Sequence, residues 1–166
     1  IMKCVINLLE HSQLKFENYE HGKYSSSSAE ISNLWKTQKL GFHMESLPPK
    51  SFSCPYHLHH MEEELFIAFK GSVMVRQDNE FFEINEGDLI VFKAGIAHQF
   101  YNHTESHFIF FALSNKEPNE ICEYPDSNKK WDRQQKKLFQ KGIELEDYWK
   151  DEENPEQHWP SAIIKS

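Results

Sequence analysis

The central part of the chain consists of short segments in which apolar residues alternate with polar ones or form brief continuous runs. The segments are, in order, 39–49, 65–71, 72–77, 81–85, 89–95, 97–102 and 106–113. An alternation of period two over four to eight residues predicts a half-buried β-strand. Because successive segments leave no room for a helix between them, the pattern predicts an all-β protein, an antiparallel sandwich or barrel.

The two ends of the chain lack this pattern. Residues 21–35 are polar and rich in serine, which predicts a surface loop around Tyr24–Ser28, and after Pro118 the periodicity weakens into turn-like sequences. We therefore expect irregular extensions on both sides of the core. A chain of 166 residues suits one domain. Its predicted parts are an N-terminal strand and Ser-rich loop (1–38), a barrel core (39–117) and a C-terminal extension packed on the barrel (118–166).

Composition narrows the classes of partner. The formal net charge is −8, and the basic run at 129–137 is followed directly by an acidic one, so the two runs are expected to compensate each other on the surface. Nucleic-acid binding depends on clustered Lys and Arg, and a membrane-spanning helix needs about 20 apolar residues. The sequence shows neither feature, and we expect no nucleic-acid or membrane partner.

Cysteine usage bears on the compartment. Cys4, Cys54 and Cys122 are odd in number and widely spaced, which indicates neither a disulfide framework nor a thiolate zinc site. The first residues have a lone Lys and no small-residue cleavage site, so they do not predict a signal peptide. A reducing, cytoplasmic location is the resulting expectation.

The densest cluster of ionisable residues lies in the stretch Cys54–Gly71. Side chains two apart on a strand share a face, so His57 and His59 are expected to project together. Glu64 opens the next strand, where a carboxylate among apolar neighbours needs a partner. A divalent cation would supply that partner and bind the neutral imidazoles.

A fourth candidate ligand follows in the stretch 86–102, where His98 enters a strand after Gly95. The pattern His57-x-His59-x4-Glu64-x6-Gly71 resembles the first motif of the cupin superfamily, and Gly87-x5-Lys93-x-Gly95-x2-His98-x3-Asn102 resembles the second. The fifteen residues between the motifs suit their usual separation. Lys93 stands where the second motif usually has Pro, a turn position that is not a ligand. The flanking sequences are similar to those of small single-domain bacterial cupins of mostly uncharacterised activity.

The resemblance implies an antiparallel jelly-roll barrel and one divalent transition metal per chain, Fe, Mn, Ni or Zn, held by His57, His59, Glu64 and His98. Such a ligand set leaves two positions of an octahedral cation open for a small molecule. Cupins of this size are commonly two-fold dimers, and we expect a homodimer formed through strand edges or through residues 1–10 and the segment beyond 118.

Other residues near the motifs have simpler interpretations. One register slip would make Glu63 the ligand, but Glu64 keeps the six-residue gap to Gly71. We interpret Glu62 and Glu63 as surface carboxylates and His60 as a solvent-facing or supporting side chain. The remaining isolated histidines, His43, His103 and His107, are interpreted as packing residues.

Two classes of function fit these residues. One is a metal-dependent enzyme acting on a small organic or sugar-like molecule, with oxygenase, isomerase or decarboxylase chemistry implied by the resemblance; the other is a non-catalytic module that binds or senses a small ligand. An ionisable group beside the open metal positions would favour the enzyme, whereas an apolar wall would favour the binding module. We also hypothesise that the Ser-rich segment Tyr24–Ser28 lies across the open end of the barrel.

Overall fold

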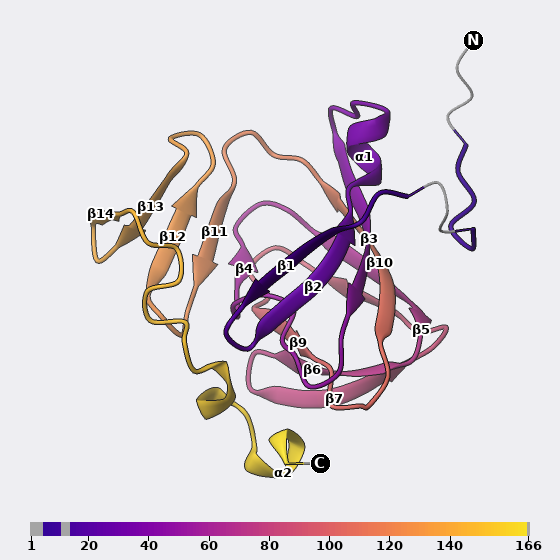
Figure 1. Ribbon diagram of the computed structural model, residues 1–166. Helices are drawn as coiled ribbons and strands as arrows, with labels where there is room; N and C mark the ends of the chain where they lie inside the picture. The colour runs from indigo at the N-terminus through magenta and orange to yellow at the C-terminus, as the bar shows by residue number, and fades with distance from the viewer. Residues whose placement is uncertain (1–4, 11–13, 166) are drawn as a thin grey trace.

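The computed structural model describes residues 5–10 and 14–165, and in this part of the chain almost all regular structure is β (Figure 1). Cys4, residues 1–3 and residues 11–13, on which part of the predicted N-terminal segment falls, lie outside the described residues. The strands are β1 Glu17–His21, β2 Tyr24–Ala29, β3 Leu40–Leu47, β4 Leu58–His59, β5 Glu64–Lys70, β6 Ser72–Gln77, β7 Glu80–Asn85, β8 Leu89–Phe92, β9 His98–Tyr101, β10 Phe108–Asn115, β11 Ile121–Tyr124, β12 Lys129–Asp132, β13 Lys137–Gln140 and β14 Ile143–Leu145. The helices are short: α1 Ile31–Leu34, the 3₁₀ turn η2 Pro155–His158 and α2 Ser161–Ile164.

The strands form three sheets. A six-stranded sheet has the order β1-β2-β3-β10-β5-β8, a three-stranded sheet the order β7-β6-β9, and a five-stranded sheet the order β14-β13-β12-β11-β4. Paired strands run antiparallel throughout, as predicted. The sheets are open, however, and do not close into the barrel that the sequence analysis expected. The mainly β, antiparallel fold class is thus confirmed, with an arrangement consistent with a jelly roll.

The core lies between the six-stranded and three-stranded sheets. On β5, Phe66 and Ala68 are buried while Leu65 and Ile67 are partly exposed, which is the alternation that the sequence predicted. β10 pairs with β3 on one side and β5 on the other, so Phe110 and Ala112 extend the same apolar layer. Burial of such aromatic and aliphatic side chains is the main stabilising contribution to a fold of this kind.

A glycine makes the tight connection between β5 and β6. Gly71 has φ +82°, and a Cβ placed on it would stand 3.0 Å from the backbone oxygen of His107. Only glycine tolerates this conformation without strain and this approach without a backbone shift. The turn reverses the chain directly after β5 and so fixes the relation between the two sheets.

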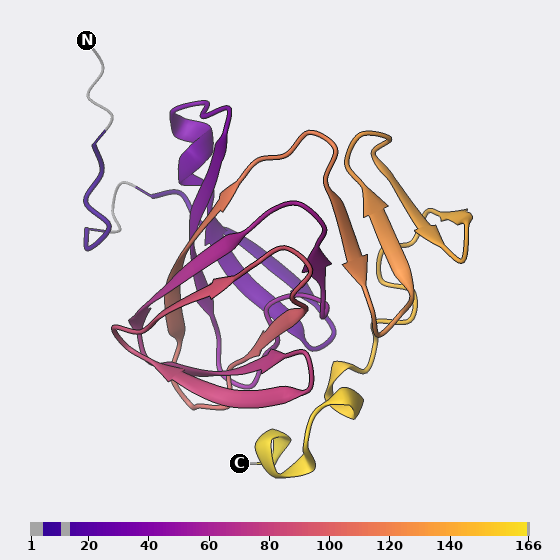
Figure 2. The same ribbon diagram turned by 180° about the vertical axis from the view of Figure 1, so that it is seen from behind.

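Both predicted irregular extensions contain strands, and the loop predicted at Tyr24–Ser28 is wrong. This segment is β2, which pairs with β1 and β3, and its end residues Tyr24 and Ala29 are buried. Four serines in a row carry no apolar alternation, so backbone pairing with β3 rather than side-chain pattern makes this strand. Beyond Pro118, β11–β14 form antiparallel hairpins that lie beside the body of the molecule in both views (Figures 1 and 2).

The C-terminal segment returns from these hairpins toward the three-stranded sheet (Figure 2). Trp159 is 5% exposed, packs edge-on against Phe52 and Tyr101, and donates a hydrogen bond of 2.8 Å from Nε1 to Gln99 Oε1. This anchor holds the segment against the core. No helix within residues 5–10 and 14–165 has the length and apolar character needed to cross a membrane.

Candidate metal centre

Three imidazoles approach one carboxylate oxygen. Glu64 Oε2 lies 3.0 Å from Nε2 of His98, 3.4 Å from Nε2 of His59 and 3.9 Å from Nε2 of His57. His57, Glu64 and His98 each offer a ligand atom within 4.8 Å of the other two. The structure thus brings the four side chains singled out in the sequence to one place, from β4, β5, the start of β9 and the residue before β4.

Backbone pairing holds two of these histidines side by side. His57 and His98 form an isolated antiparallel bridge, in which each donates its N–H to the carbonyl oxygen of the other at 3.2 and 2.8 Å. Each ring also directs Nδ1 to a carbonyl oxygen two residues earlier, Pro55 O at 2.9 Å and Ile96 O at 3.3 Å. A carbonyl only accepts, so Nδ1 carries the proton and Nε2 of the neutral ring is left with a free lone pair toward Glu64.

His59 is supported differently, by carboxylates. Its Nδ1 lies 3.4 Å from Glu120 Oε1 and 3.7 Å from Glu62 Oε2. Glu120 is 1% exposed and accepts hydrogen bonds from the backbone N–H groups of His60, Met61 and Glu62, at 2.7, 2.9 and 2.9 Å. These carboxylates favour a proton on Nδ1 of His59 and so direct Nε2 toward Glu64.

The charges of the cluster perturb one another strongly. Burial alone would raise the pKa of Glu64, but the facing imidazoles of His98, His57 and His59 outweigh it and lower the pKa to about 2. Burial lowers the pKa of His98, and a charge on His57 lowers it further. Burial also lowers the pKa of His59. The cluster therefore presents an ionised carboxylate and at least two imidazoles that favour the neutral form, which is the state that metal ions bind.

The donor set fits a divalent metal ion. Glu64 Oε2 and His98 Nε2 are buried and make no hydrogen bond of good geometry within the described residues, and neither does His59 Nδ1. Buried polar atoms without partners are costly, and a cation between the first two would satisfy both. Two donors bound at right angles to one metal, each at about 2.1 Å, stand about 3.0 Å apart. The 3.0 Å separation from His98 matches this spacing, while the separations of 3.4 Å from His59 and 3.9 Å from His57 are wider.

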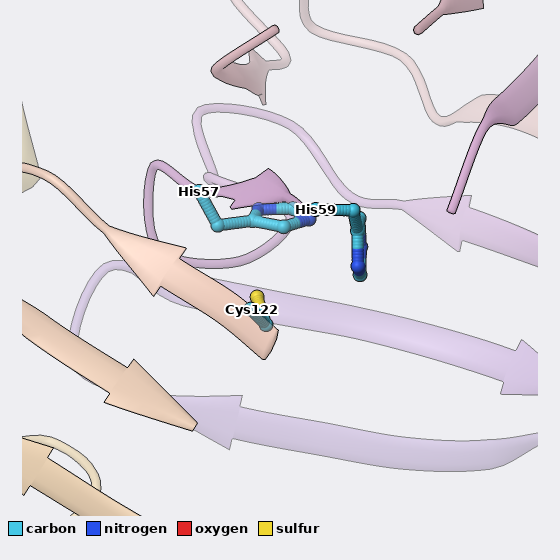
Figure 3. A group of neighbouring side chains, drawn as sticks. All are labelled: His57, His59 and Cys122. Atoms are coloured by element: carbon cyan, nitrogen blue, oxygen red, sulfur yellow. The ribbon is translucent and has the colours of Figure 1, made fainter. Parts of the chain in front are cut away.

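A thiol adjoins the same cluster. Cys122 on β11 pairs in register with His59, and its sulfur is directed toward the imidazoles of His57 and His59 (Figure 3). These three residues also offer ligand atoms within 4.8 Å of one another. Burial raises the pKa of the Cys122 thiol. No role for this cysteine could be inferred from the sequence, because only the pairing of β11 with β4 brings it to the site.

A cavity of about 190 Å³ opens beside the cluster. Its lining combines the metal-facing side chains with polar and aromatic ones: Ser26, His43, Glu45, Ser53, Cys54, His57, Glu64, Phe66, His98, Phe100 and Phe110. Ser26 belongs to β2, so one residue of the Ser-rich segment does reach the site, although as part of a strand. The aromatic side chains of Phe66, Phe100 and Phe110 form the apolar wall.

Several neighbouring residues differ from their sequence interpretation. Glu62 is not a surface carboxylate: it is 3% exposed and forms an ion pair with Arg133, 71 residues further on. His43 is not a simple packing residue, since it lines the cavity and lies 3.3 Å from Glu45. Glu63 is exposed, as expected, and His60 pairs at 3.0 Å with Glu123 near the surface. The ion pair between Glu62 and Arg133 joins distant parts of the chain, so no local motif predicts it.

Comparison with solved structures identifies similar folds. A candidate sugar phosphate isomerase from Acidithiobacillus ferrooxidans is 21% identical, with a TM-score of 0.72 over 86% of this chain and 90% of that one. A sugar phosphate isomerase of the cupin superfamily from Silicibacter pomeroyi is 21% identical, with a TM-score of 0.70 over 80% and 91%. A predicted oxalate decarboxylase from Thermotoga maritima is 18% identical, with a TM-score of 0.58 over 65% and 97%. At these identities the likeness shows the fold.

Comparison with curated proteins finds no significant match. The model of the cupin domain matches residues 43–114, a stretch that begins within β3, ends within β10 and includes all four predicted ligands. This match agrees with the two motifs and with the fold of the structural neighbours. Residues 43–114 of this chain therefore match the cupin domain.

Proposed function

We propose that this cupin is a metal-dependent enzyme acting on a small oxygen-bearing molecule, with His57, His59, Glu64 and His98 as the metal ligands. One observation carries the proposal. The convergence of three imidazole Nε2 atoms on Glu64 Oε2 lies at the wall of a cavity that also contains ionisable side chains. A metal bound there would act as a Lewis acid on a ligand oxygen, and its place beside the cavity would give that ligand access.

The donor set supports a divalent transition metal. Imidazole suits Zn, Cu, Fe and Ni, while a carboxylate also admits Mn, so Fe, Mn, Ni and Zn all fit the proposed ligands. The chain's own contribution is orientation. The backbone bridge between His57 and His98 and the carboxylates behind His59 hold the Nε2 atoms in place before a metal arrives.

The polar part of the cavity supports an enzyme over a binding module. His43 and Glu45 face the same space as the proposed ligands, so ionisable groups stand where a metal-bound molecule would lie. A purely apolar wall would have favoured binding alone. Two structural neighbours are named as a sugar phosphate isomerase and a predicted oxalate decarboxylase. Both names refer to small substrates, which agrees with a site of this size.

Elemental analysis of the purified full chain tests the metal centre. We expect up to one divalent transition metal per chain, removed by a chelator and restored by added Mn²⁺ or Zn²⁺. An anomalous-scattering map should then place the ion between Glu64 and His98. Protein that takes up no metal at neutral pH, or that binds it elsewhere, contradicts the ligand assignment.

We also propose that the chain forms a homodimer and that residues 39–117 fold with both flanking segments as one domain, in the cytoplasm. β8 is an edge strand of the six-stranded sheet, and its Leu89 and Val91 side chains are 57% and 46% exposed. Light scattering should give twice 19.7 kDa. Val91→Lys should shift the mass toward the monomer, while Ile143→Lys, on an exposed hairpin, should not. A wild-type monomer contradicts the assembly.

A further inference from the structure

A pair of ionisable side chains on β3 faces the cavity without belonging to the proposed metal ligands. His43 and Glu45 are two residues apart and share the inward face of the strand, where Nε2 of His43 lies 3.3 Å from Glu45 Oε2. A second carboxylate lies beside this ring, because Glu30 Oε1 is 4.0 Å from Nδ1. The pair is thus an imidazole flanked by carboxylates.

The register of the sheet places this pair two strands away from Glu64, on the same face of the six-stranded sheet. His43 pairs with Ala112 on β10, and Ala112 pairs with Phe66 on β5, one step beyond Glu64 on the same face. Neighbouring strands are about 4.8 Å apart, so β3 and β5 are separated by about 10 Å. A molecule of a few heavy atoms held at the metal centre would therefore fill the space up to His43.

The charge of the cavity limits what that molecule is. Its charged side chains are Glu45 and Glu64, and no Lys or Arg lines it among the residues that the structure describes. Phosphate groups in proteins are bound by Arg forks, Lys or clustered backbone N–H groups. Beyond the metal that Glu64 would help to bind, a phosphate in this space would meet the Glu45 carboxylate and an aromatic wall, with no guanidinium or ammonium group of the lining to pair with it, which is unfavourable at low local dielectric.

The size and polarity of the cavity also favour a small ligand without a phosphate group. The cavity of about 190 Å³ is smaller than the roughly 300–1,000 Å³ of pockets for drug-sized ligands. Ser26 and Ser53 offer hydroxyl groups on one side, and Phe66, Phe100 and Phe110 offer apolar surface on the other. A short carbon chain bearing hydroxyl and carbonyl oxygens matches both walls.

We propose that the cavity takes a small uncharged hydroxy-carbonyl compound and that His43, oriented by Glu45, transfers the proton at the carbon next to the carbonyl group. The inference rests on the proposed metal-dependent function. Neutral His43 accepts the proton as the C–H bond breaks, and the electron pair moves to the carbonyl oxygen, which leaves an enediolate. Return of a proton from the imidazolium to carbon restores a neutral compound, so the step balances without an oxidant or a reductant.

The surroundings of His43 suit this role. Burial alone would lower the pKa of His43, but the hydrogen bond and charge of Glu45, with the charges of Glu30 and Glu64, outweigh it and raise the pKa above the ordinary value. Proton-transfer groups are most effective when both protonation states are populated near the working pH. The carboxylate of Glu45 also stabilises the imidazolium formed in the step.

The test uses the full chain loaded with Mn²⁺ and dihydroxyacetone as the probe, in D₂O. We expect the protein to exchange the C–H protons of dihydroxyacetone for deuterium faster than protein-free Mn²⁺ does. His43→Gln should slow this exchange about a hundredfold or more. Glu45→Gln should slow it less and move the rising limb of the pH profile to lower pH, because the pKa of His43 falls when the carboxylate charge is lost. Rescue of the rate by Glu45→Asp distinguishes positioning from loss of fold.

A matched control lies outside the cavity. His103 and Glu83 form a similar imidazole–carboxylate pair at 3.2 Å, and neither lines the cavity. His103→Gln should leave the exchange rate within about twofold of wild type, since surface substitutions away from the site have small effects. An equal loss in His103→Gln and His43→Gln overturns the assignment.

Two further measurements distinguish failure of the proposed ligand class, of the proton-transfer role and of the metal centre. Water-proton relaxation by bound Mn²⁺ should fall when dihydroxyacetone binds, and dihydroxyacetone phosphate should produce a weaker effect at equal concentration. Stronger binding of the phosphate overturns the uncharged ligand class. Metal and dihydroxyacetone binding without His43-dependent exchange overturns the proton-transfer role while the metal centre stands. Absence of bound Mn²⁺ overturns the proposed function itself.

Discussion

Glu120 is a single side chain on which the geometry of the metal centre depends. Its carboxylate is 1% exposed, and it accepts three backbone hydrogen bonds from the turn between His59 and Glu64. The same carboxylate faces Nδ1 of His59 at 3.4 Å. One group therefore fixes both the turn that spaces two proposed ligands and the orientation of one of them.

The magnitude of its removal follows from the donors that lose their acceptor. In Glu120→Ala these are the N–H groups of Met61 and Glu62, whereas the N–H of His60 also donates to Ile121 O at 3.0 Å. Each unsatisfied donor costs about 1–3 kcal/mol. The side chain of Met61 is 48% exposed, so water should reach part of this turn. We therefore expect the lower end of the sum, about 2 kcal/mol of unfolding free energy, measured by urea denaturation of the metal-free protein.

Glu120→Gln separates the electrostatic contribution from the structural one. The amide keeps the size of the side chain but removes the negative charge beside His59, so metal affinity should fall about 10–100-fold. Glu123→Gln is the control, because Glu123 is 30% exposed at its side chain and pairs with His60 and Lys130 near the surface. An unchanged urea midpoint in Glu120→Ala, or unchanged metal affinity in Glu120→Gln, refutes this reasoning.

Three further outcomes are expected. His98→Ala should lower metal occupancy more than tenfold in elemental analysis, whereas His60→Ala should not; equal retention contradicts the ligand set. Occupancy should already fall as the pH drops from alkaline values toward neutrality and should keep falling below it, because burial lowers the pKa of His57 but the nearby cysteines and Glu64 outweigh burial and raise it well above its ordinary value, so its proton competes with the metal; occupancy that stays constant from alkaline to acidic pH contradicts the idea. Glu152→Gln should cost about 3 kcal/mol in urea denaturation, because Lys129 is 0% exposed and lies 2.9 Å from Glu152; a cost below about 1 kcal/mol would count against this.

The strands of the core could be predicted because each carries its own signal. Residues 65–71 and 72–77 nearly coincide with β5 and β6, and on β5 the buried Phe66 and Ala68 alternate with the partly exposed Leu65 and Ile67. Period-two alternation is a local property, and it survives wherever one side of a strand is buried. β2 could not be found in this way, because a run of serines has no apolar face and its strand conformation comes from β1 and β3.

The residues of the candidate metal centre likewise fall into two groups, those that local spacing predicts and those that only long-range strand pairing brings to the site. His57, His59, Glu64 and His98 were singled out from two short motifs, in which spacing along a strand sets the direction of each side chain. Cys122, Glu120 and Arg133 lie 56 to 69 residues beyond Glu64, and they reach the site only because β11 pairs with β4. The spacing of residues within a motif does not indicate which distant segment of the chain will pack against it.

The pairing of Arg133 with Glu62 connects the C-terminal segment to the chemistry of the site. Glu62 and Glu120 together hold the turn before Glu64, and Glu62 is neutralised by Arg133 from the loop that joins β12 to β13. Two buried carboxylates beside an imidazole would repel each other without that guanidinium. Arg133 therefore offsets the negative charge of this carboxylate pair behind His59. The hairpins beyond Pro118 thus place a charged side chain close to the proposed metal centre. Neither of the two cupin motifs includes any residue of these hairpins.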